Sequence, residues 1–509
     1  MRKLTSLKQR LINWVKKNRW EAIALLIILL AAAFLRLFRI NGYMTFLGDE
    51  GRDVLVVKRM IVDHKLTLLG PTASVGGFFL GPIYYYLMIP FLWLFRLNPV
   101  GPAVMVALFG IATVYLVYQV GKDFFGASAG LIAASLYAVS PVIIAYSRSS
   151  WNPNLMPFFS LLIIYLLWLT VKKKKLHLLG LVGFLLGITF QLHYLATFLV
   201  PIIVIYLLFL TFKKENLKNY CYGLGGFFLG WSPFLLFEIR HQFPNLLTLY
   251  RFVFFGKETG LVPGHFLPTI SEIGFRLFPR LVTNNNLFLG FLTMVLSLVF
   301  FILFGLQQRK KKKELFLLLT LWLVLGVGLF GFYQKAVYDY YLGFLFPLPF
   351  LLTGLGLSAM KKWPLTKILA GLLFSLLIFL NLQGMPFRYT PNHQLNQAKA
   401  VAQSIFEAAQ GKPFNFALIT GQNSDHAYRY FLEIWGTPPV TIENPQIDPE
   451  RKTVTDQLFV VCETLPCAPL GHSLWEIAGF GRAEIEKEWE VSVIKVFKLK
   501  PWHEEETNR

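Results

Sequence analysis

Apolar segments of about 20 residues recur along this chain, and they constrain its fold more than any other feature. A helix needs roughly 20 apolar residues to cross the ~30 Å hydrocarbon layer of a membrane. The hydrophobic share of 55% is also too high for a soluble domain of this size. We therefore predict a polytopic α-helical membrane protein with about eleven transmembrane helices. The predicted spans are 22–38, 101–120, 128–146, 155–171, 176–192, 195–212, 219–237, 287–306, 314–332, 341–360 and 364–384.

The formal net charge of +21 is gathered in short basic clusters between the apolar segments. A nucleic-acid-binding protein would spread its basic residues over one soluble face, so we expect no nucleic-acid partner. The clusters indicate the cytoplasmic side of a membrane protein. They are the N-terminal segment 1–21, Lys172–Lys175, Lys213–Lys218, Arg309–Lys313 and Lys361–Lys362. The first span is expected to be retained, because Arg36 and Arg39 close it in place of a cleavage site.

One apolar segment, Gly81–Phe95, is too short to be a span. As a helix it reaches only about 22 Å, and Pro90 interrupts it. If this segment is an interfacial or re-entrant helix that does not cross the membrane, every basic cluster lies on the cytoplasmic side. Residues 41–100 then form a first long outer loop and 239–286 another. The result is a multi-pass protein of the cell membrane with a cytoplasmic N-terminus and an extracytoplasmic C-terminus.

The composition changes near residue 385, which divides the chain into a membrane domain, 22–385, and a small soluble α/β domain, 386–509. Alternating patterns predict helices over 396–410 and 425–435, the second with Ser424 as its N-cap, and strands over 414–420, 457–462 and 491–498. Cys462 and Cys467 lie close together in an outer compartment, where a local disulfide and two unpaired thiols are equally compatible with the sequence.

The first candidate for chemistry is the run Gly48–Asp53, just after the first span. Adjacent acids at a membrane exit can act as a base, bind a cation or simply mark a solvated loop. The flanking glycines permit a tight turn and close approach of a substrate. We predict Asp49 and Glu50 as the catalytic acids, with Arg52 as a ligand of a donor phosphate.

The second candidate is Ser147–Asn154, a later outer link. Arg148 is either a snorkelling anchor or a phosphate ligand, since a guanidinium matches phosphate geometry. Asn152 is either the N-cap of the next helix, with Pro153 in first position, or a contact for a substrate. Asn154 is a second candidate for such a contact.

Three further polar clusters break the apolar pattern. In Gln191–Tyr194, His193 is either a buried bundle histidine or a donor to a phosphate, and Tyr194 is a candidate substrate contact. In Glu238–His241, Glu238 and Arg240 form either an ion pair or a substrate contact. In Tyr338–Tyr341, the aromatic rings suit a membrane interface, with Tyr340 able to reach a headgroup.

Taken together, the Asp-Glu pair after a first span, the Gly-Pro and aromatic interfacial helix and the Ser147-Arg148 step resemble the GT-C membrane glycosyltransferases. The resemblance is to the protein O-mannosyltransferases and lipid A aminoarabinose transferases, over about residues 20–385. It implies that Asp49 acts near the acceptor, either as a base or as a ligand of a metal ion. The family usually has an Asp after its Ser-Arg segment, where this chain has only Asn152 and Asn154, so no cofactor is certain and a divalent cation at Asp49 is left open.

The resemblance implies transfer of one sugar, hexosyl or pentosyl, from a polyprenyl-phosphate carrier to a protein, lipid or polysaccharide acceptor on the outer face. Asp49 would take the acceptor proton, and Arg148 and His193 would stabilise the departing phosphate in an inverting single displacement. A transporter or flippase of lipid-linked substrates is the main alternative, although the chain shows no matching pair of interrupted repeats. A scaffold protein that binds a partner through residues 386–509 is the third.

Overall fold

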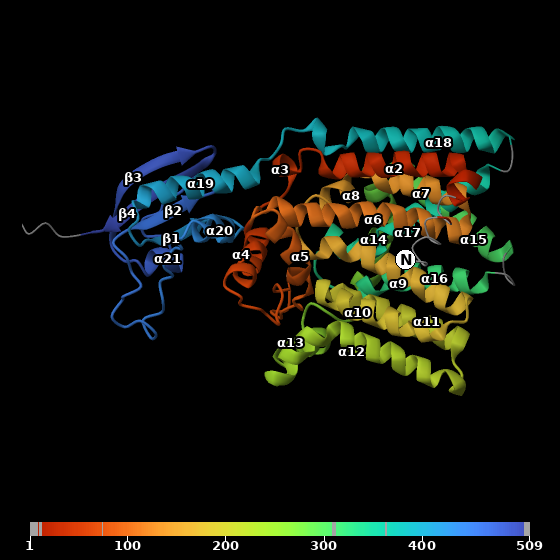
Figure 1. The fold of residues 1–509 in the computed structure, drawn as a ribbon, viewed down its shortest axis with the longest axis horizontal. Helices are drawn as coiled ribbons and strands as arrows, with labels where there is room; N and C mark the ends of the chain where they lie inside the picture. Colours follow the sequence, from red (N-terminus) through yellow and green to blue (C-terminus); the bar gives the residue numbers. More distant parts are fainter. Residues whose placement is uncertain (1–8, 10–12, 74, 308–311, 362–363, 503–509) are drawn as a thin grey trace, which may run out of the picture. The chain divides into compact units, whose positions relative to one another are not determined.

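The computed structural model describes residues 9, 13–73, 75–307, 312–361 and 364–502 (Figure 1). Most of the basic segment 1–21, residues 309–311 of one predicted basic cluster and Lys362 of another lie outside this part. The chain divides into two compact units. The helical unit comprises Met1–Ile40, Leu66–Phe91 and Pro102–Thr390, and the mixed unit comprises Asn41–Lys65, Leu92–Gly101 and Pro391–Arg509.

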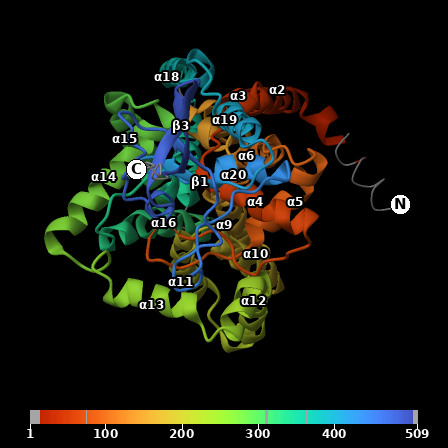
Figure 2. The ribbon, with the colours of Figure 1, turned by 90° about the vertical axis from the view of Figure 1, so that its left-hand side faces the viewer.

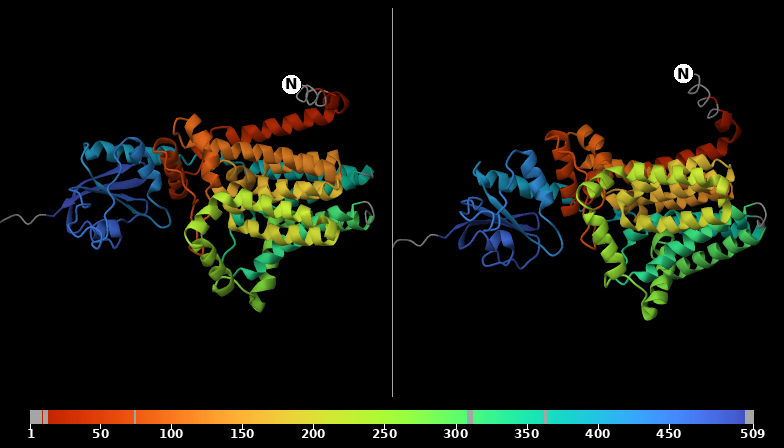
Figure 3. Two further views of the ribbon diagram at one scale, coloured as in Figure 1. Left: turned by 60° about the horizontal axis from the view of Figure 1, so that its bottom comes forward. Right: turned by 90° about the horizontal axis from the view of Figure 1, so that it is seen from below.

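The helical unit is built from apolar helices that run side by side in Figures 1 and 3 and are seen end-on in Figure 2. Each of the eleven apolar segments predicted from the sequence contains one of these helices. They are α2 (Arg19–Leu37), α6 (Val100–Phe125), α7 (Ala127–Val139), α9 (Met156–Lys172), α10 (Leu179–Leu192), α11 (Leu199–Thr211), α12 (Leu217–Arg240), α15 (Leu287–Gln307), α16 (Lys313–Gly328), α17 (Pro347–Met360) and α18 (Pro364–Gln383).

Length and composition support a membrane protein but give a lower count of spans. Seven helices of the described residues are long and apolar enough to cross a membrane. The number rises to eight if α17 and the preceding 3-10 helix η6 (Asp339–Leu345), bent by 55° from each other, form one span. Helices such as α7, with 13 residues, are apolar but short. The polytopic helical fold is therefore confirmed, and the count of about eleven stays a prediction.

Helices α10 and α12 pack backbone against backbone, which fixes the end of α10 that leads to His193. A Cβ atom on Gly183 would lie 1.9 Å from the carbonyl oxygen of Gly223, and one on Gly187 would lie 2.3 Å from that of Phe227. Small residues at such a crossing let two apolar helices approach closely in lipid, where the hydrophobic effect does not hold them together.

The two predicted outer loops of the membrane domain contain helices. The segment Gly81–Phe95 holds α5 (Ile83–Leu94), with Pro90 inside it as expected. The segment 239–286, predicted as a long outer loop, holds α13 (Pro244–Phe255) and α14 (Pro263–Val282). Both helices begin with a proline in the first turn, where its fixed φ favours helix. The predicted loop is therefore helical over most of its length.

The mixed unit contains a four-stranded sheet in the order β1-β2-β4-β3. β1 (Asn415–Ile419) pairs in parallel with β2 (Leu458–Cys462), which pairs antiparallel with β4 (Ile494–Pro501). β3 (Ala483–Val491) completes the sheet against β4. Its helices are α4 (Gly48–Val62), α19 (Gln394–Ala409), α20 (His426–Ile434) and the short α21 (Trp475–Ala478), with α3 (Ile40–Tyr43) at its first residues.

The small C-terminal α/β domain is thus present, with two local corrections. The predicted strand 491–498 is a turn between β3 and β4 at its start, where Ser492 adopts a positive φ of 60°. β3 is absent from the predicted strands, although Ala483, Ile485, Trp489 and Val491 alternate with glutamates along it and only Lys487 interrupts the pattern. Helix α20 begins one residue later than expected, and Asp425 rather than Ser424 occupies its N-cap position.

Cys462 at the end of β2 forms a disulfide with Cys467, which settles the alternative left open by the sequence. Cys221 is the remaining cysteine of the chain and is exposed and free. We therefore expect a maleimide to label one cysteine in the denatured, unreduced chain and all three after reduction, as measured by intact mass. The Cys221→Ser variant should take no label without reduction and two labels after reduction. Three labels without reduction would contradict the disulfide.

Candidate functional site

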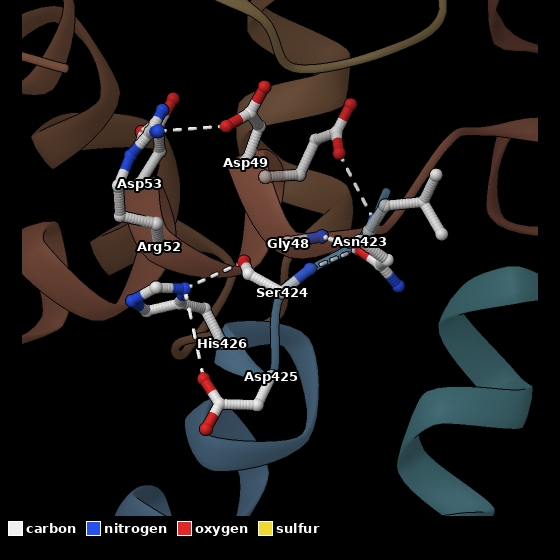
Figure 4. Close-up of polar contacts among 10 residues, drawn as sticks. Gly48, Asp49, Arg52, Asp53, Asn423, Ser424, Asp425 and His426 are labelled. Carbon is white, nitrogen blue, oxygen red and sulfur yellow. Dashed lines mark hydrogen bonds and ion pairs between the residues drawn. The ribbon is translucent and has the colours of Figure 1, made fainter. Parts of the chain in front are cut away.

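The predicted catalytic acids lie in the first turn of α4, which begins at Gly48 (Figure 4). The side chain of Asp49 is 53% exposed, whereas Glu50 and Asp53 are buried. Of the two predicted acids, only Asp49 therefore presents its carboxylate to solvent. Carboxylates in a first helical turn are favoured, because the helix dipole places partial positive charge there.

Arg52 pairs with two carboxylates of α4. Its Nη1 lies 2.8 Å from Oδ1 of Asp49, and its Nε and Nη2 donate to Oδ1 of Asp53 at 2.9 and 2.8 Å. The guanidinium thus fixes the rotamer of Asp49 against the buried Asp53. The predicted contact of Arg52 with a donor phosphate remains a prediction, and in this structure its side chain is engaged by the two carboxylates.

Glu50 is held differently from Asp49. Its Oε2 accepts a hydrogen bond from the backbone N–H of Leu47 at 3.1 Å, so the side chain folds back over the start of the helix. Burial raises the pKa of Glu50 to about 7, because the charged form loses its hydration. The nearby Asp49 and Asp53 carboxylates add to this rise in pKa. Glu50 can therefore exchange a proton near neutral pH, but only from a buried position.

Residues from the far end of the sequence complete this turn within the mixed unit. The N–H of Gly48 donates to Oδ1 of Asn423 at 2.7 Å, and Oγ of Ser424 lies 2.8 Å from Nδ1 of His426 (Figure 4). Burial lowers the pKa of His426, and Arg52 and Arg429 act in the same direction, partly offset by Asp425. Asn423 is not among the predicted site residues, since 375 positions separate it from Gly48 and no local pattern links the two.

In the helical unit, Arg148 is fully buried at the end of α2. Its two terminal nitrogens donate to the backbone carbonyls of Leu35 and Phe38, each at 2.8 Å, and its guanidinium lies 5.0 Å from the ring centre of Phe387. A cation at these carbonyls complements the negative end of the helix dipole. The anchor at an aqueous interface, one of the two predicted alternatives, is therefore wrong. Arg36, also fully buried, donates to the carbonyl of Ala138 at 3.1 Å.

His193 and Tyr194, from one predicted cluster, come together with Tyr340 from another. The ring of His193 stacks on Tyr194 at 4.4 Å and meets the edge of Tyr340 at 5.9 Å. Tyr341 lies beside all three rings, and Trp151 packs on Tyr340 at 4.5 Å. His193 is buried, and its Nδ1 accepts the N–H of Leu195 at 3.3 Å, which fixes the orientation of its ring.

An apolar cavity of about 450 Å³ adjoins this aromatic cluster in the helical unit. Tyr194 and Tyr341 belong to both the cluster and the cavity wall. The remaining wall comes from helix α13, with Phe252, from the 3-10 turn at residues 194–198, with Phe198, and from residues 329–333, with Phe330 and Tyr333. A cavity of this size lies in the range that accommodates a small ligand or part of a long apolar one.

The other predicted contacts mostly support the backbone. Asn152 is not an N-cap, because its Nδ2 donates to the carbonyl of Leu192 at 2.6 Å and α9 begins only at Met156. Asn154 donates to the carbonyl of Ser149 at 2.9 Å. Glu238 is buried and accepts from Asn245 at 2.8 Å and from the N–H of Leu246 at 2.9 Å, which anchors the start of α13. Arg240 is exposed at the end of α12. Their roles toward a substrate stay predictions.

A metal ion at Asp49 finds little support in the surroundings. Among the described residues, no group of three or more His, Cys, Asp and Glu side chains could hold a metal. Asp49 itself is paired with Arg52, whose positive charge opposes a cation at the same carboxylate. We therefore derive no chemical step through a metal.

Comparison with known proteins gives matches at two levels. Residues 80–237 match the family model described as dolichyl-phosphate-mannose-protein mannosyltransferase. This region contains Arg148 and His193 but not Asp49. The provisionally named mannosyltransferases YkcB and YycA of Bacillus subtilis (strain 168) are 30% and 29% identical over 194 and 190 residues. Each match spans 36% of this chain and about a quarter, 26% and 27%, of the relative.

Solved structures match over nearly the whole chain. ArnT from Cupriavidus metallidurans, bound to undecaprenyl phosphate, superimposes with a TM-score of 0.63 and covers 95% of this chain and 98% of its own, at 12% identity. The oligosaccharyltransferase AglB from Archaeoglobus fulgidus, in complex with an inhibitory peptide and a dolichol-phosphate, gives a TM-score of 0.56 at 13% identity, over 88% of this chain and 70% of its own. The chain thus has the polytopic helical fold of ArnT and AglB, and the fold that the resemblance implies is confirmed.

The buried carboxyl of Glu50 gives a pH-dependent stability that can be measured. Its pKa of about 7 in the folded protein lies above the ordinary 4.5, so the folded state keeps the proton between these values while the unfolded state loses it. The free energy of unfolding therefore falls as the pH rises through this window, by roughly 3 kcal/mol at ~1.4 kcal/mol per unit. Glu50→Gln should remove this loss.

In detergent, the melting temperature of the wild type should drop between pH 4.5 and pH 8 relative to Glu50→Gln. The surface variant Glu407→Gln serves as the matched control and should follow the wild type. A difference between wild type and Glu50→Gln that is constant with pH would show that the pKa of Glu50 is not raised.

Proposed function

We propose that this protein transfers one sugar, hexosyl or pentosyl, from a polyprenyl-phosphate-linked donor to an acceptor outside the cytoplasm. The observation that carries the proposal is the acidic first turn of α4, where Asp49 is exposed and held by Arg52. It occurs in a chain whose fold matches that of ArnT bound to undecaprenyl phosphate over 95% of its length. The mannosyltransferase family model and the two Bacillus relatives support the same reaction class.

The proposed chemistry is a single displacement at the anomeric carbon. An acceptor hydroxyl gives its proton to the carboxylate of Asp49 while its oxygen bonds to the anomeric carbon, and the bond from that carbon to the donor phosphate oxygen breaks. Attack opposite to the leaving phosphate inverts the anomeric configuration. Arg52 suits this role of Asp49, because its guanidinium holds the carboxylate in one rotamer. Glu50 supports the turn through its bond to Leu47.

The donor would be recognised by the helical unit. Its apolar cavity beside Tyr194 suits part of an isoprenoid chain. Arg148 and His193 are the proposed ligands of the donor phosphate, and both lie in the region that matches the mannosyltransferase family. Arg148 also has a structural role at the end of α2, so its replacement tests binding and folding together.

The transporter alternative has less support. The matches to named mannosyltransferases and to an oligosaccharyltransferase favour group transfer over transport. No observation identifies the acceptor, and protein, lipid and polysaccharide remain the proposed classes.

Replacing Asp49 by Asn should abolish transfer, because an amide does not accept the acceptor proton. Deleting the gene should cause its lipid-linked sugar to accumulate, which mass spectrometry of extracted lipids would detect. Wild type should clear this lipid on re-expression, and Asp49→Asn should not.

The matched control is Asp63→Asn, the same change at the other end of α4, which should clear the lipid as the wild type does. Membrane levels of both variants would be compared by immunoblot. If Asp49→Asn cleared the accumulated lipid at the wild-type rate, Asp49 would not be the base, and the proposed mechanism would fail.

The proposed orientation places the N-terminus in the cytoplasm and the mixed unit's C-terminal part outside, in the cell membrane. Alkaline phosphatase fused after Trp502 should therefore be active, and a fluorescent protein at the same point should be dark. Insertion of the same reporters after Lys173, in the predicted cytoplasmic link, should give the reverse pattern. Equal activity at both positions would reject the topology.

A further inference from the structure

Helix α4, which carries the proposed catalytic acids, is packed into the C-terminal domain. Oε1 of Gln394 at the start of α19 accepts the N–H of Phe46 at 3.1 Å. At the far end of the helix, Arg59 and Lys58 both contact the carboxylate of Glu433 on α20. The acidic turn of α4 lies between these two attachments.

The contact surface requires glycine at two positions of α4. A Cβ on Gly48 would lie 2.0 Å from Oγ of Ser424, and a Cβ on Gly51 would lie 2.3 Å from the backbone N of Ala427. The two glycines that flank Asp49 and Glu50 thus allow the segment 423–427 to lie directly against the acidic turn. From the sequence these glycines are expected to permit a tight turn and close approach of a substrate, and in the structure the chain's own segment 423–427 approaches them.

Asn423 contacts the start of α4 through its side-chain oxygen. Oδ1 accepts the N–H of Gly48 at 2.7 Å and that of its own neighbour Ser424 at 2.9 Å. The N–H of Gly48 is one of the first-turn donors that have no partner within a helix. N-cap side chains usually satisfy such donors from the preceding residue, but here Leu47 has no polar side chain, and Asn423 supplies the acceptor from another domain segment.

Glu463 fixes which way the Asn423 amide faces. The amide nitrogen donates to Oε1 and Oε2 of Glu463 at 2.9 and 3.1 Å, so only the amide oxygen is left for Gly48. Glu463 in turn accepts from the hydroxyls of Thr420 and Tyr428, both at 2.7 Å. These donors to the Glu463 carboxylate are neutral. Because a carboxylate only accepts hydrogen bonds, the nitrogen of the Asn423 amide must face Glu463 and its oxygen must face Gly48.

We propose that Asn423, oriented by Glu463, positions the catalytic turn of α4 for transfer. Both are positioning residues that act through Gly48 on the neighbouring Asp49. The inference rests on the proposed function of Asp49. It makes the C-terminal domain part of the catalytic apparatus, because a shift of about 1 Å in a reacting group can cost roughly 100-fold in rate.

In the Asn423–Glu463 pair an amide donates to a carboxylate, so exchanging the two types of side chain between the positions tests the contact. Asn423→Asp places two carboxylates against each other, and their repulsion should pull the substituted side chain away from Gly48. Glu463→Gln keeps an acceptor for the Asn423 amide and should be mild. In the double variant N423D/E463Q, the new carboxylate can accept from Gly48 and Ser424 on one side and from the glutamine amide on the other.

The readout is the rate at which full-length protein in membranes consumes the lipid-linked sugar that accumulates in the deletion strain. We expect kcat of Asn423→Asp to fall about 10- to 100-fold with the donor KM unchanged, because the donor contacts are intact. The double variant should recover most of this loss. Asn444→Asp, the same change on an exposed turn of the same unit, should leave kcat unchanged.

Amide hydrogen exchange measures the same contact without any activity. The peptide that covers residues 47–51 should exchange faster in Asn423→Asp than in the wild type, and its protection should return in the double variant. If the wild type transferred no sugar, the proposed function would fail, and the exchange result would still decide the contact. Wild-type kcat in Asn423→Asp, or a double variant no better than Asn423→Asp, would overturn the positioning role.

Discussion

In hydrocarbon, a backbone N–H or C=O group has no water to bond, and an unpaired one costs several kcal/mol. This constraint explains why the apolar segments of the chain are helices, and it also explains their ends. Where α2 ends, the guanidinium of Arg148 donates hydrogen bonds to the carbonyls of Leu35 and Phe38. Where α10 ends, the amide of Asn152 donates a hydrogen bond to the carbonyl of Leu192. Buried polar side chains of the helical unit thus complete the backbone where the helices stop.

This requirement bears on the interpretation of the predicted site. Arg148 and Asn152 are residue types that suit a phosphate or a sugar, and they are also the types that can satisfy orphan carbonyls deep in a bundle. Their contacts show the second role directly. His193 is likewise buried and tied to Leu195, but it lies in a cluster of tyrosines beside an apolar cavity. Arg148 therefore has a structural role beside the proposed one toward a donor phosphate, whereas His193 lies beside space that a ligand could fill.

The mixed unit follows the same rule at the surface. The first N–H of α4 is satisfied by Asn423, and Arg52 pairs with Asp49 and Asp53. Asp49 is half exposed, whereas Glu50 is buried and its side chain folds back to the N–H of Leu47. Two acids that are adjacent in sequence therefore have different environments, one exposed to solvent and one whose pKa burial raises to about 7.

The class of fold could be predicted from the amino-acid sequence, because the length and periodicity of apolar segments are local properties. The same patterns located a helix in each of the eleven apolar segments, strands β1 and β2, and the acidic turn after the first span. They missed β3, where Lys487 interrupts an alternation of apolar residues with glutamates, and they indicated a loop over 239–286 although each helix there begins with a favourable proline. That Asn423 contacts the start of α4, that Glu463 orients Asn423, and that Tyr340 contacts His193 became visible only in the folded chain. Those contacts join segments far apart in sequence, and nothing local in the chain records them.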